Sequence, residues 1–291
     1  MSGGTAPTRG ILLMILAILL FTAMDAAAKG LIARYPAPQV VWVRFAGQMV
    51  IVVLLLGPRL GAALRTRFPV LHFWRSAFQF GATTCFFLSL PHIGLAEATA
   101  LTDINPVLIT LGAALFLGER LGPRRIAGVI VALIGALIVI RPGAGVFSWW
   151  ALLPLCAALS YTGNALLTRK IGAQESPWAS MIYAALFGTL VAGAVLPSVW
   201  QPVDPADWWR FALIGCLGSG AQLCIIRSFS MTEAAIVAPF AYLGIVFATV
   251  WGVVLFDQWP DRWTVIGALV IVGAGLYVWH RETMAARAAQ S

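Results

Sequence analysis

Apolar segments of about 20 residues recur along the whole chain, with little sequence between them. A helix needs about 20 predominantly apolar residues to cross the hydrocarbon core of a bilayer. Helices also satisfy their own backbone hydrogen bonds in lipid, where water is absent. We therefore predict an all-α integral membrane protein with ten spanning helices. Their approximate bounds are 10–32, 39–57, 70–91, 95–117, 123–141, 148–168, 178–197, 208–229, 233–256 and 262–280.

The composition excludes most other classes. Hydrophobic residues make up 60% of the chain and charged residues 10%, whereas soluble domains carry about 25% charged residues. The net charge of +8 does not indicate nucleic acid, because the basic residues flank apolar segments. Lys29 and Lys170 are the only lysines, so a P-loop is absent. The four cysteines lie in apolar segments without metal-ligand spacing, and we expect no cofactor and no metal.

An internal repeat relates the two halves of the chain. An offset of 139 residues pairs many identical residues, and each half holds five predicted helices. We predict two repeats, 10–141 and 149–280, followed by a cytoplasmic tail at 281–291. Because five is odd, the second repeat must enter the bilayer from the opposite side, as in transporters with inverted repeats. The identical pairs include Pro38 and Pro177, Pro58 and Pro197, Gly81 and Gly220, Cys85 and Cys224, Ser89 and Ser228, and Gly128 and Gly267.

Equivalent loops of the two halves carry opposite charge. Arg59, Arg65 and Arg67 follow the second segment, whereas its counterpart is followed by Asp204 and Asp207. Basic loops stay in the cytoplasm, so we predict that both termini are cytoplasmic and that the acidic loops are external. The tryptophans that cluster at the expected outer helix ends form an interfacial belt: Trp149, Trp150, Trp200, Trp208, Trp209, Trp259 and Trp263.

Residues Asn105 to Val139 carry the most recognisable pattern. Pro106, the run Gly118-Glu119-Arg120-Leu121 and Gly128 resemble the repeat of the EamA family in the drug/metabolite transporter superfamily. The second copy departs from the pattern, with Ile245 where Pro106 would be and Gln258 where the family glutamate usually stands.

The resemblance implies a fold and a function. It implies ten helices around a central cavity, with the fifth and tenth helices packed outside it. Within the family, the chain is most similar to bacterial amino-acid exporters, including aromatic amino-acid exporters of the YddG type. We therefore expect a carrier of a small-molecule substrate in the bacterial inner membrane.

Charged residues within apolar segments are the candidates for coupling. Asp25 and Lys29 lie four apart on one helical face and either neutralise each other as an ion pair or form a titratable site. Asp103 is either structural or involved in coupling. Arg75 is expected to extend toward an interface. Arg44 either does the same or binds a substrate carboxylate.

Further polar and aromatic residues are candidates for the cavity wall. Phe78, Gln79 and Thr83 share one face of the third segment, which either lines a wet cavity or packs against another helix. Other cavity candidates, chosen by position, are Tyr161, Asn164, Gln222 and Tyr242. Pro239 and Gly244 are expected to loosen the ninth helix near its middle.

Transport is the favoured function, because rival classes lack their signatures. A membrane enzyme needs clustered catalytic groups, but His72, His92 and His280 sit at separate helix ends. A channel needs a polar stripe along its pore, and the sequence shows no obvious stripe of this kind. The sequence predicts a secondary transporter that exports small metabolites, most favourably amino acids, by alternating access. The alternative is a multidrug or other-metabolite carrier, for example of the nucleoside or nucleotide-sugar type.

Overall fold

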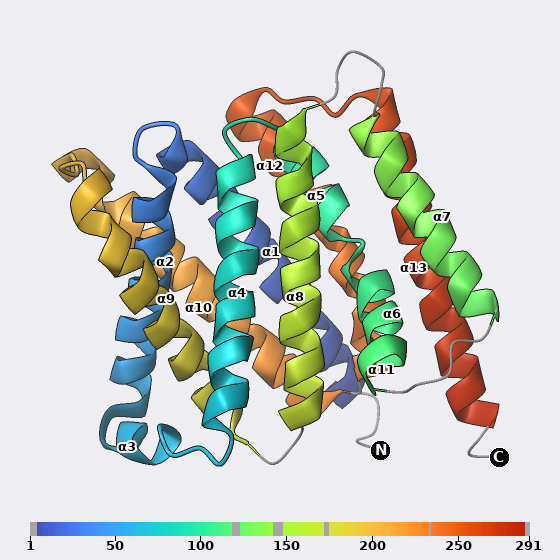
Figure 1. Ribbon diagram of the computed structural model, residues 1–291, viewed down its shortest axis with the longest axis horizontal. Coiled ribbons are helices and arrows are strands. Elements are labelled where there is room, and N and C mark those ends of the chain that lie inside the picture. Colours follow the sequence, from blue (N-terminus) through green and yellow to red (C-terminus); the bar gives the residue numbers. More distant parts are fainter. Residues whose placement is uncertain (1–4, 118–122, 142–147, 172–174, 233, 289–291) are drawn as a thin grey trace.

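Helices dominate the computed structural model, which describes residues 5–117, 123–141, 148–171, 175–232 and 234–288. They run up and down side by side (Figure 1). The longer helices are α1 (Thr5–Ile32), α2 (Ala37–Leu56), α4 (Pro69–Ser89), α5 (Leu95–Thr102), α6 (Asn105–Leu117), α7 (Pro123–Ile140), α8 (Leu152–Ile171), α9 (Pro177–Val199), α10 (Trp208–Met231), α12 (Leu243–Phe256) and α13 (Arg262–Ala288). The short ones are η1 (Gly57–Arg59), α3 (Leu60–Ala63), η2 (Trp149–Ala151), η4 (Pro205–Asp207), α11 (Ala234–Val237) and η5 (Ala238–Tyr242).

The described residues include eight helical segments that are long and apolar enough to span a membrane. A shorter apolar helix covers Ile126–Ile140, and α4 has 21 residues that include the polar side chains of His72, Arg75 and Gln79. Large apolar side chains, such as Leu54, Phe116 and Val254, are exposed on the outside. Such a surface belongs in lipid rather than in water, so the chain is an all-α, multi-pass membrane protein.

Local sequence explains where several helices begin. Proline at the first helical positions has no amide hydrogen to lose and has its φ preset for a helix. Pro69 and Pro177 begin α4 and α9 in this way, and the Ser176 hydroxyl caps α9 by accepting from the amide of Trp178. Similarly, the Asp261 carboxylate accepts from the amide of Thr264 in the first turn of α13, at 2.8 Å.

The two halves interdigitate. The most extensive packing of α1 is against α10, and that of α4 is against α8. In the predicted repeat these pairs are equivalent, because α8 corresponds to α1 and α10 to α4. Likewise α2 packs on its counterpart α9, and α7 on its counterpart α13. This exchange of partners supports the predicted repeat and excludes two separately packed half-domains.

Helices α7 and α13 form a separate pair at one edge of the bundle (Figure 1). Their backbones touch at glycines: a Cβ at Gly267 would lie 2.7 Å from the carbonyl oxygen of Gly135. At Gly128 the neighbour is a side chain instead, because a Cβ there would collide with a methyl group of Val278. Ala132 and Ala136 are buried in the same contact. Small residues such as Gly128, Ala132, Gly135 and Ala136 therefore let the two helices approach closely.

Two spanning segments are broken rather than continuous. The segment predicted at 95–117 divides into α5 and α6 at Asp103 and Ile104, a break that our sequence analysis did not predict. The segment predicted at 233–256 contains the 3-10 turn η5 before α12, close to the predicted weak point at Pro239 and Gly244. In addition, α1 starts at Thr5, and α13 continues to Ala288, into the segment expected to be a tail.

Candidate functional site

Arg44 is the most conspicuous charge in the interior. It lies in the middle of α2, and only 8% of its surface is exposed. Its guanidinium lies over the ring of Phe45, 4.8 Å from the centroid. Nevertheless Nε and Nη1 have no hydrogen-bond partner among the described residues. Unmade hydrogen bonds to a buried charged group are costly, so Arg44 has two donors available for a ligand.

Asp25 supplies the opposite charge. This α1 carboxylate and the Arg44 guanidinium are close enough to interact electrostatically. Asp25 lies deep in the bundle, yet part of its side chain remains accessible. The two side chains therefore present one negative and one positive group within the interior, contributed by neighbouring helices.

The ion pair considered for Asp25 and Lys29 does not form. Lys29 instead donates from Nζ to the carbonyl oxygens of Leu90 and Ile93, both at 2.6 Å. These bonds tie α1 to the connection between α4 and α5. Lys29 also interacts electrostatically with Glu97. Its ammonium is therefore engaged at the end of the bundle, and Asp25 is left to Arg44.

Arg75 connects three helices and does not extend to an interface. Its side chain is buried, and it donates from Nε to the Thr168 hydroxyl at 2.8 Å and from Nη1 to the Ser180 carbonyl at 3.0 Å. It therefore joins α4 to α8 and α9. The prediction that Arg75 extends toward an interface is wrong, because its side chain is buried and bonded to neighbouring helices. The sequence alone could not identify these partners.

Gln79 of α4 and Asn164 of α8 join these two helices at a second point. The Asn164 amide donates to Gln79 Oε1 at 3.0 Å, while Asn164 Oδ1 is buried without a partner among the described residues. Phe78 packs on Gly163, whose Cβ, if present, would lie 2.9 Å from the ring. On this face of α4, Phe78 and Gln79 therefore make contacts between helices, and Thr83 is buried.

Tyr161 faces inward and is nevertheless exposed. On α8 the outward face carries Leu152, Cys156 and Leu159, all of them exposed. At 3.6 residues per turn, Tyr161 lies on the opposite face, together with the buried Asn164. Its exposed fraction of 42% is therefore accessible surface within the protein. It also interacts electrostatically with Arg75.

The remaining candidates occupy two different places. Gln222 of α10 is half-buried. Tyr242 of η5 is buried, its hydroxyl has no partner among the described residues, and it interacts electrostatically with Asp103 at the break between α5 and α6. The candidates are thus brought together as pairs: Asp25 with Arg44, Arg75 with Tyr161, Gln79 with Asn164, and Asp103 with Tyr242.

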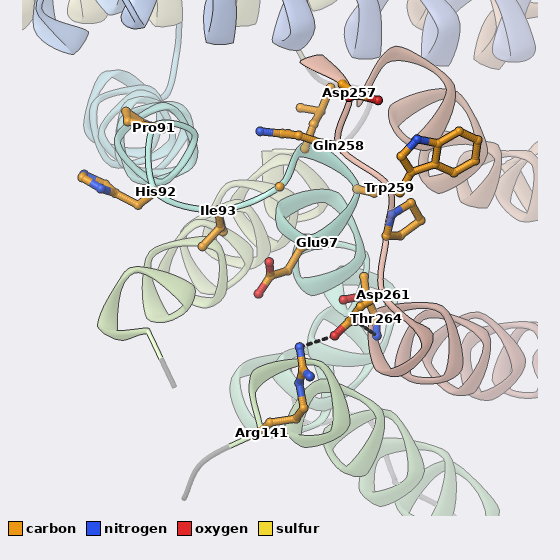
Figure 2. A pocket seen from close by; sticks show the side chains of 14 residues that line it. Pro91, His92, Ile93, Glu97, Arg141, Asp257, Gln258, Trp259, Asp261 and Thr264 are labelled. Carbon is orange, nitrogen blue, oxygen red and sulfur yellow. Dashed lines mark hydrogen bonds and ion pairs between the residues drawn. The ribbon is translucent and has the colours of Figure 1, made fainter. Parts of the chain in front are cut away.

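A pocket of about 480 Å³ opens at one end of the bundle. Its walls come from the connection between α4 and α5, the start of α5, the end of α7 and the connection between α12 and α13 (Figure 2). Glu97, Asp257 and Asp261 give it acidic walls, and His92 lies at its edge, stacked on Trp150 with centroids 3.6 Å apart. The pocket therefore favours solutes with positive or zwitterionic groups.

An ion pair between Arg141 and Asp261 crosses the pocket wall at 2.5 Å and joins the two halves of the chain (Figure 2). Burial raises the pKa of Asp261, but hydrogen bonds from Thr264 and the charge of Arg141 outweigh it, so the pKa lies below its ordinary value. Our sequence analysis singled out neither Asp261 nor Arg141 as a site residue. Nothing in the sequence places these two residues together.

Comparison with known proteins identifies the family. The EamA-like transporter family matches residues 8–141 and 148–279. The chain belongs to this family. It is 32% identical to the pseudopaline exporter CntI of Pseudomonas aeruginosa, over 91% of this chain and 94% of that one.

Other relatives are also transporters. The chain is 29% identical to a riboflavin transporter of Rhizobium johnstonii, over 94% of this chain and 91% of the relative. It is 24% identical to an S-adenosylmethionine uptake transporter of Rickettsia prowazekii, over 94% and 93% of the two chains. A crystal structure with 21% identity superposes with a TM-score of 0.65 over 98% of this chain and 99% of that one, which shows a shared fold. The EamA chain described here is thus a small-metabolite transporter.

Proposed function

We propose that this EamA protein is a secondary transporter of the bacterial inner membrane that exports amino acids or similar zwitterions by alternating access. The observation that carries the proposal is the pair formed by Arg44 and Asp25. An arginine presents planar donors that suit a carboxylate. A carboxylate such as that of Asp25 suits an ammonium group. A zwitterion with both groups matches the pair in charge.

The energetics favour a ligand at Arg44. Its Nε and Nη1 are buried without partners in the described part of the chain, and a hydrogen bond to a charged group is worth about 1.5–3 kcal/mol. A substrate carboxylate recovers this free energy, whereas an apolar solute does not. Discrimination between zwitterions and apolar solutes follows, because a site built from polar groups rejects compounds that leave those groups unpaired.

Alternating access is supported by the arrangement of the two halves. Equivalent helices exchange partners across the bundle, with α1 on α10 and α8 on α4. Inverted repeats of this kind allow one group of helices to rock against the other around a central site. The acidic pocket near Glu97 and Asp261 then serves as the vestibule on one side of the membrane.

A second candidate function is the transport of a larger metabolite. The similarity to the pseudopaline exporter and to the riboflavin transporter favours it, because these relatives match over nearly the whole chain. Pseudopaline and riboflavin are therefore the first compounds to compare with amino acids. A multidrug carrier is the remaining alternative.

Reconstituted vesicles provide the test. Purified protein in liposomes is preloaded in turn with labelled aromatic, aliphatic and charged amino acids, and release is measured with and without excess unlabelled compound. We expect saturable release of at least one class. Labelled riboflavin and labelled pseudopaline are loaded into separate vesicles in parallel. Saturable release of either compound, without release of any amino acid, would replace the proposal with the second candidate.

Arg44→Gln is the matching variant. We expect the apparent affinity for the transported amino acid to fall about tenfold to a hundredfold, the equivalent of about 1.5–3 kcal/mol. Arg65→Gln, a change at an exposed arginine in a loop, is the control and should leave transport unchanged. Equal transport by the Arg44 and Arg65 variants, at equal amounts of folded protein, would remove Arg44 from the site.

A further inference from the structure

The breaks in the two interrupted helices lie at equivalent positions of the repeat. Helix α5 ends at Thr102, and Asp103 leaves the helical conformation with a ψ of 2° before α6 begins at Asn105. In the second half, η5 ends at Tyr242 and α12 begins at Leu243. The offset of 139 residues makes Asp103 and Tyr242 equivalent. Both chain breaks therefore fall at one position of the repeat, and each places a polar residue there.

Both polar groups lack partners. Asp103 Oδ2 and the Tyr242 hydroxyl are buried atoms without a hydrogen-bond partner in the described part of the chain. Only 9% of the surface of Tyr242 is exposed. The two side chains nevertheless interact electrostatically. A buried polar group without a partner costs free energy, so this arrangement at the junction of two broken helices points to a ligand or to a changing protonation state.

Glycines make the space for this pair. A Cβ at Gly244 would lie 4.0 Å from Asp103 Oδ2, and a Cβ at Gly275 would collide with the Tyr242 hydroxyl. The hydroxyl of Tyr242 thus rests directly on the backbone of α13. A larger residue at Gly275 would therefore displace the Tyr242 hydroxyl, whereas a Cβ at Gly244 would only reach van der Waals contact with Asp103.

No cation of the described residues neutralises Asp103. The charged groups of α1 lie elsewhere: Asp25 interacts with Arg44, Lys29 donates to backbone carbonyls, and Arg9 is exposed near the start of the helix. Tyr161 of α8 interacts with Arg75, and Tyr277 of α13 is 45% exposed. Helix α12 and residues 126–140 of α7 contain no titratable residue. Within the described part of the chain, Tyr242 is therefore the titratable group that interacts with Asp103.

We propose that Asp103, together with Tyr242, forms a proton-binding site that couples substrate movement to the proton gradient. An isolated carboxylate in a membrane interior is costly, and binding a proton removes its charge. The neutral acid then gains a donor, for which the Tyr242 oxygen is the nearby acceptor. Opening the broken helices to water stabilises the charged carboxylate and releases the proton. The coupling rests on the proposed transport function, whereas proton binding does not.

Dicyclohexylcarbodiimide tests proton binding without any substrate, because it reacts with protonated carboxylic acids in apolar surroundings. The purified full chain is labelled over a range of pH, and the modified residue is identified by mass spectrometry. We expect the labelling of Asp103 to fall as the pH rises. Tyr242→Phe should shift the midpoint by about one pH unit. Asp103→Asn should abolish this label, and Asp204→Asn, a change at an exposed carboxylate, should retain it.

Several results would overturn the proposal. These are no labelling of Asp103 at any pH, equal labelling at every pH, and protection by sodium chloride at constant pH, which would assign the site to sodium. Coupling is then measured in vesicles: Asp103→Asn should retain exchange of the transported compound and lose the response to an imposed pH gradient. Failure of all amino-acid transport with intact pH-dependent labelling would reject the proposed substrate and leave the proton site standing.

Discussion

A single arginine in the interior strongly restricts what the protein can bind. Arg44 stays charged and sits among apolar side chains such as Phe45. Its electrostatic partner in the described chain is Asp25. Removing one member of a buried charge pair leaves the other uncompensated, and this usually costs more than removing both members. The pair can therefore be examined separately from transport.

We expect Asp25→Asn to lower the free energy of unfolding by about 3 kcal/mol, because it leaves Arg44 without its counter-charge. The double variant Asp25→Asn with Arg44→Gln should recover part of this loss. Thermal unfolding of the purified protein in detergent, arranged as a double-mutant cycle, measures the coupling. Additive effects of the two changes would show that the residues do not interact.

Glu175 links two connections at the end of the bundle where α1 begins. Its Oε1 accepts from the amide of Arg67 at 2.7 Å and from the Thr66 hydroxyl at 2.8 Å. The Arg67 hydrogen bond is the largest cause that holds the pKa of Glu175 below its ordinary value of 4.5, and the Thr66 bond adds to it. A carboxyl whose pKa is lowered in the folded state stabilises the protein above its unfolded pKa.

This contribution is lost as the pH falls through the pKa of the folded state. We expect the unfolding temperature to decrease more between about pH 6 and about pH 3 for the wild type than for Glu175→Gln. The two curves should converge at the acidic end, because the protonated carboxyl and the amide are both neutral. Parallel curves over the whole range would show that Glu175 does not contribute in this way.

At the scale of the elements, glycine allows close helix contacts between α7 and α13 and also between α2 and α10, where a Cβ at Gly47 would lie 2.8 Å from the Cα of Gly215. Between α7 and α13, the backbone itself is the contact surface. A Cβ at Gly267 would lie 2.7 Å from the carbonyl oxygen of Gly135 and 3.1 Å from the amide nitrogen of Val139. Neither backbone atom can turn away as a side chain can. Any larger residue must therefore push the two helices apart.

We expect Gly267→Val to lower the free energy of unfolding by about 1–3 kcal/mol, as overpacking does in well-packed interiors. Gly273→Val is the matched control. It lies on the same helix, and nothing lies within 4 Å of the Cβ it would gain. Unfolding temperatures of the two variants in detergent provide the comparison. Equal losses would attribute the effect to helix propensity rather than to the contact.

At the scale of the whole molecule, the two ends of the bundle differ in charge and in aromatic content. Helix α1 begins and α13 ends at the same end (Figure 1), where Arg59, Arg65 and Arg67 also lie. The opposite end carries the acidic connections with Asp204 and Asp257. It also carries seven exposed tryptophans: Trp149, Trp150, Trp200, Trp208, Trp209, Trp259 and Trp263. Such asymmetry orients a protein in a membrane.

The orientation can be tested with a reporter joined after Ser291. We expect a reporter that works only in the cytoplasm to be active, and one that works only outside the membrane to be inactive, because basic residues stay inside. Activity of the external reporter would contradict both the orientation and an even number of crossings. An internal fusion in the acidic connection near Asp204 should give the opposite pattern and serves as the control.

Much of the architecture could be predicted from local sequence, because the bilayer imposes a length and a polarity on every spanning helix. Apolar length predicted the helices, and Pro239 with Gly244 predicted a weak point near η5. The break after α5 was missed, although Pro106, which disfavours helix at the preceding residue, was an available signal.

The candidate site, unlike the helices, could be predicted only in part from the sequence. The sequence by itself determined which residue types occur at which depth, and so it identified Arg44, Asp25 and Asp103 as unusual charges. Only the tertiary structure decided their partners, because side chains more than one helical turn apart meet only when helices pack. Packing gave Asp25 to Arg44 rather than to Lys29, turned Arg75 toward Thr168, and brought Asp103 near Tyr242.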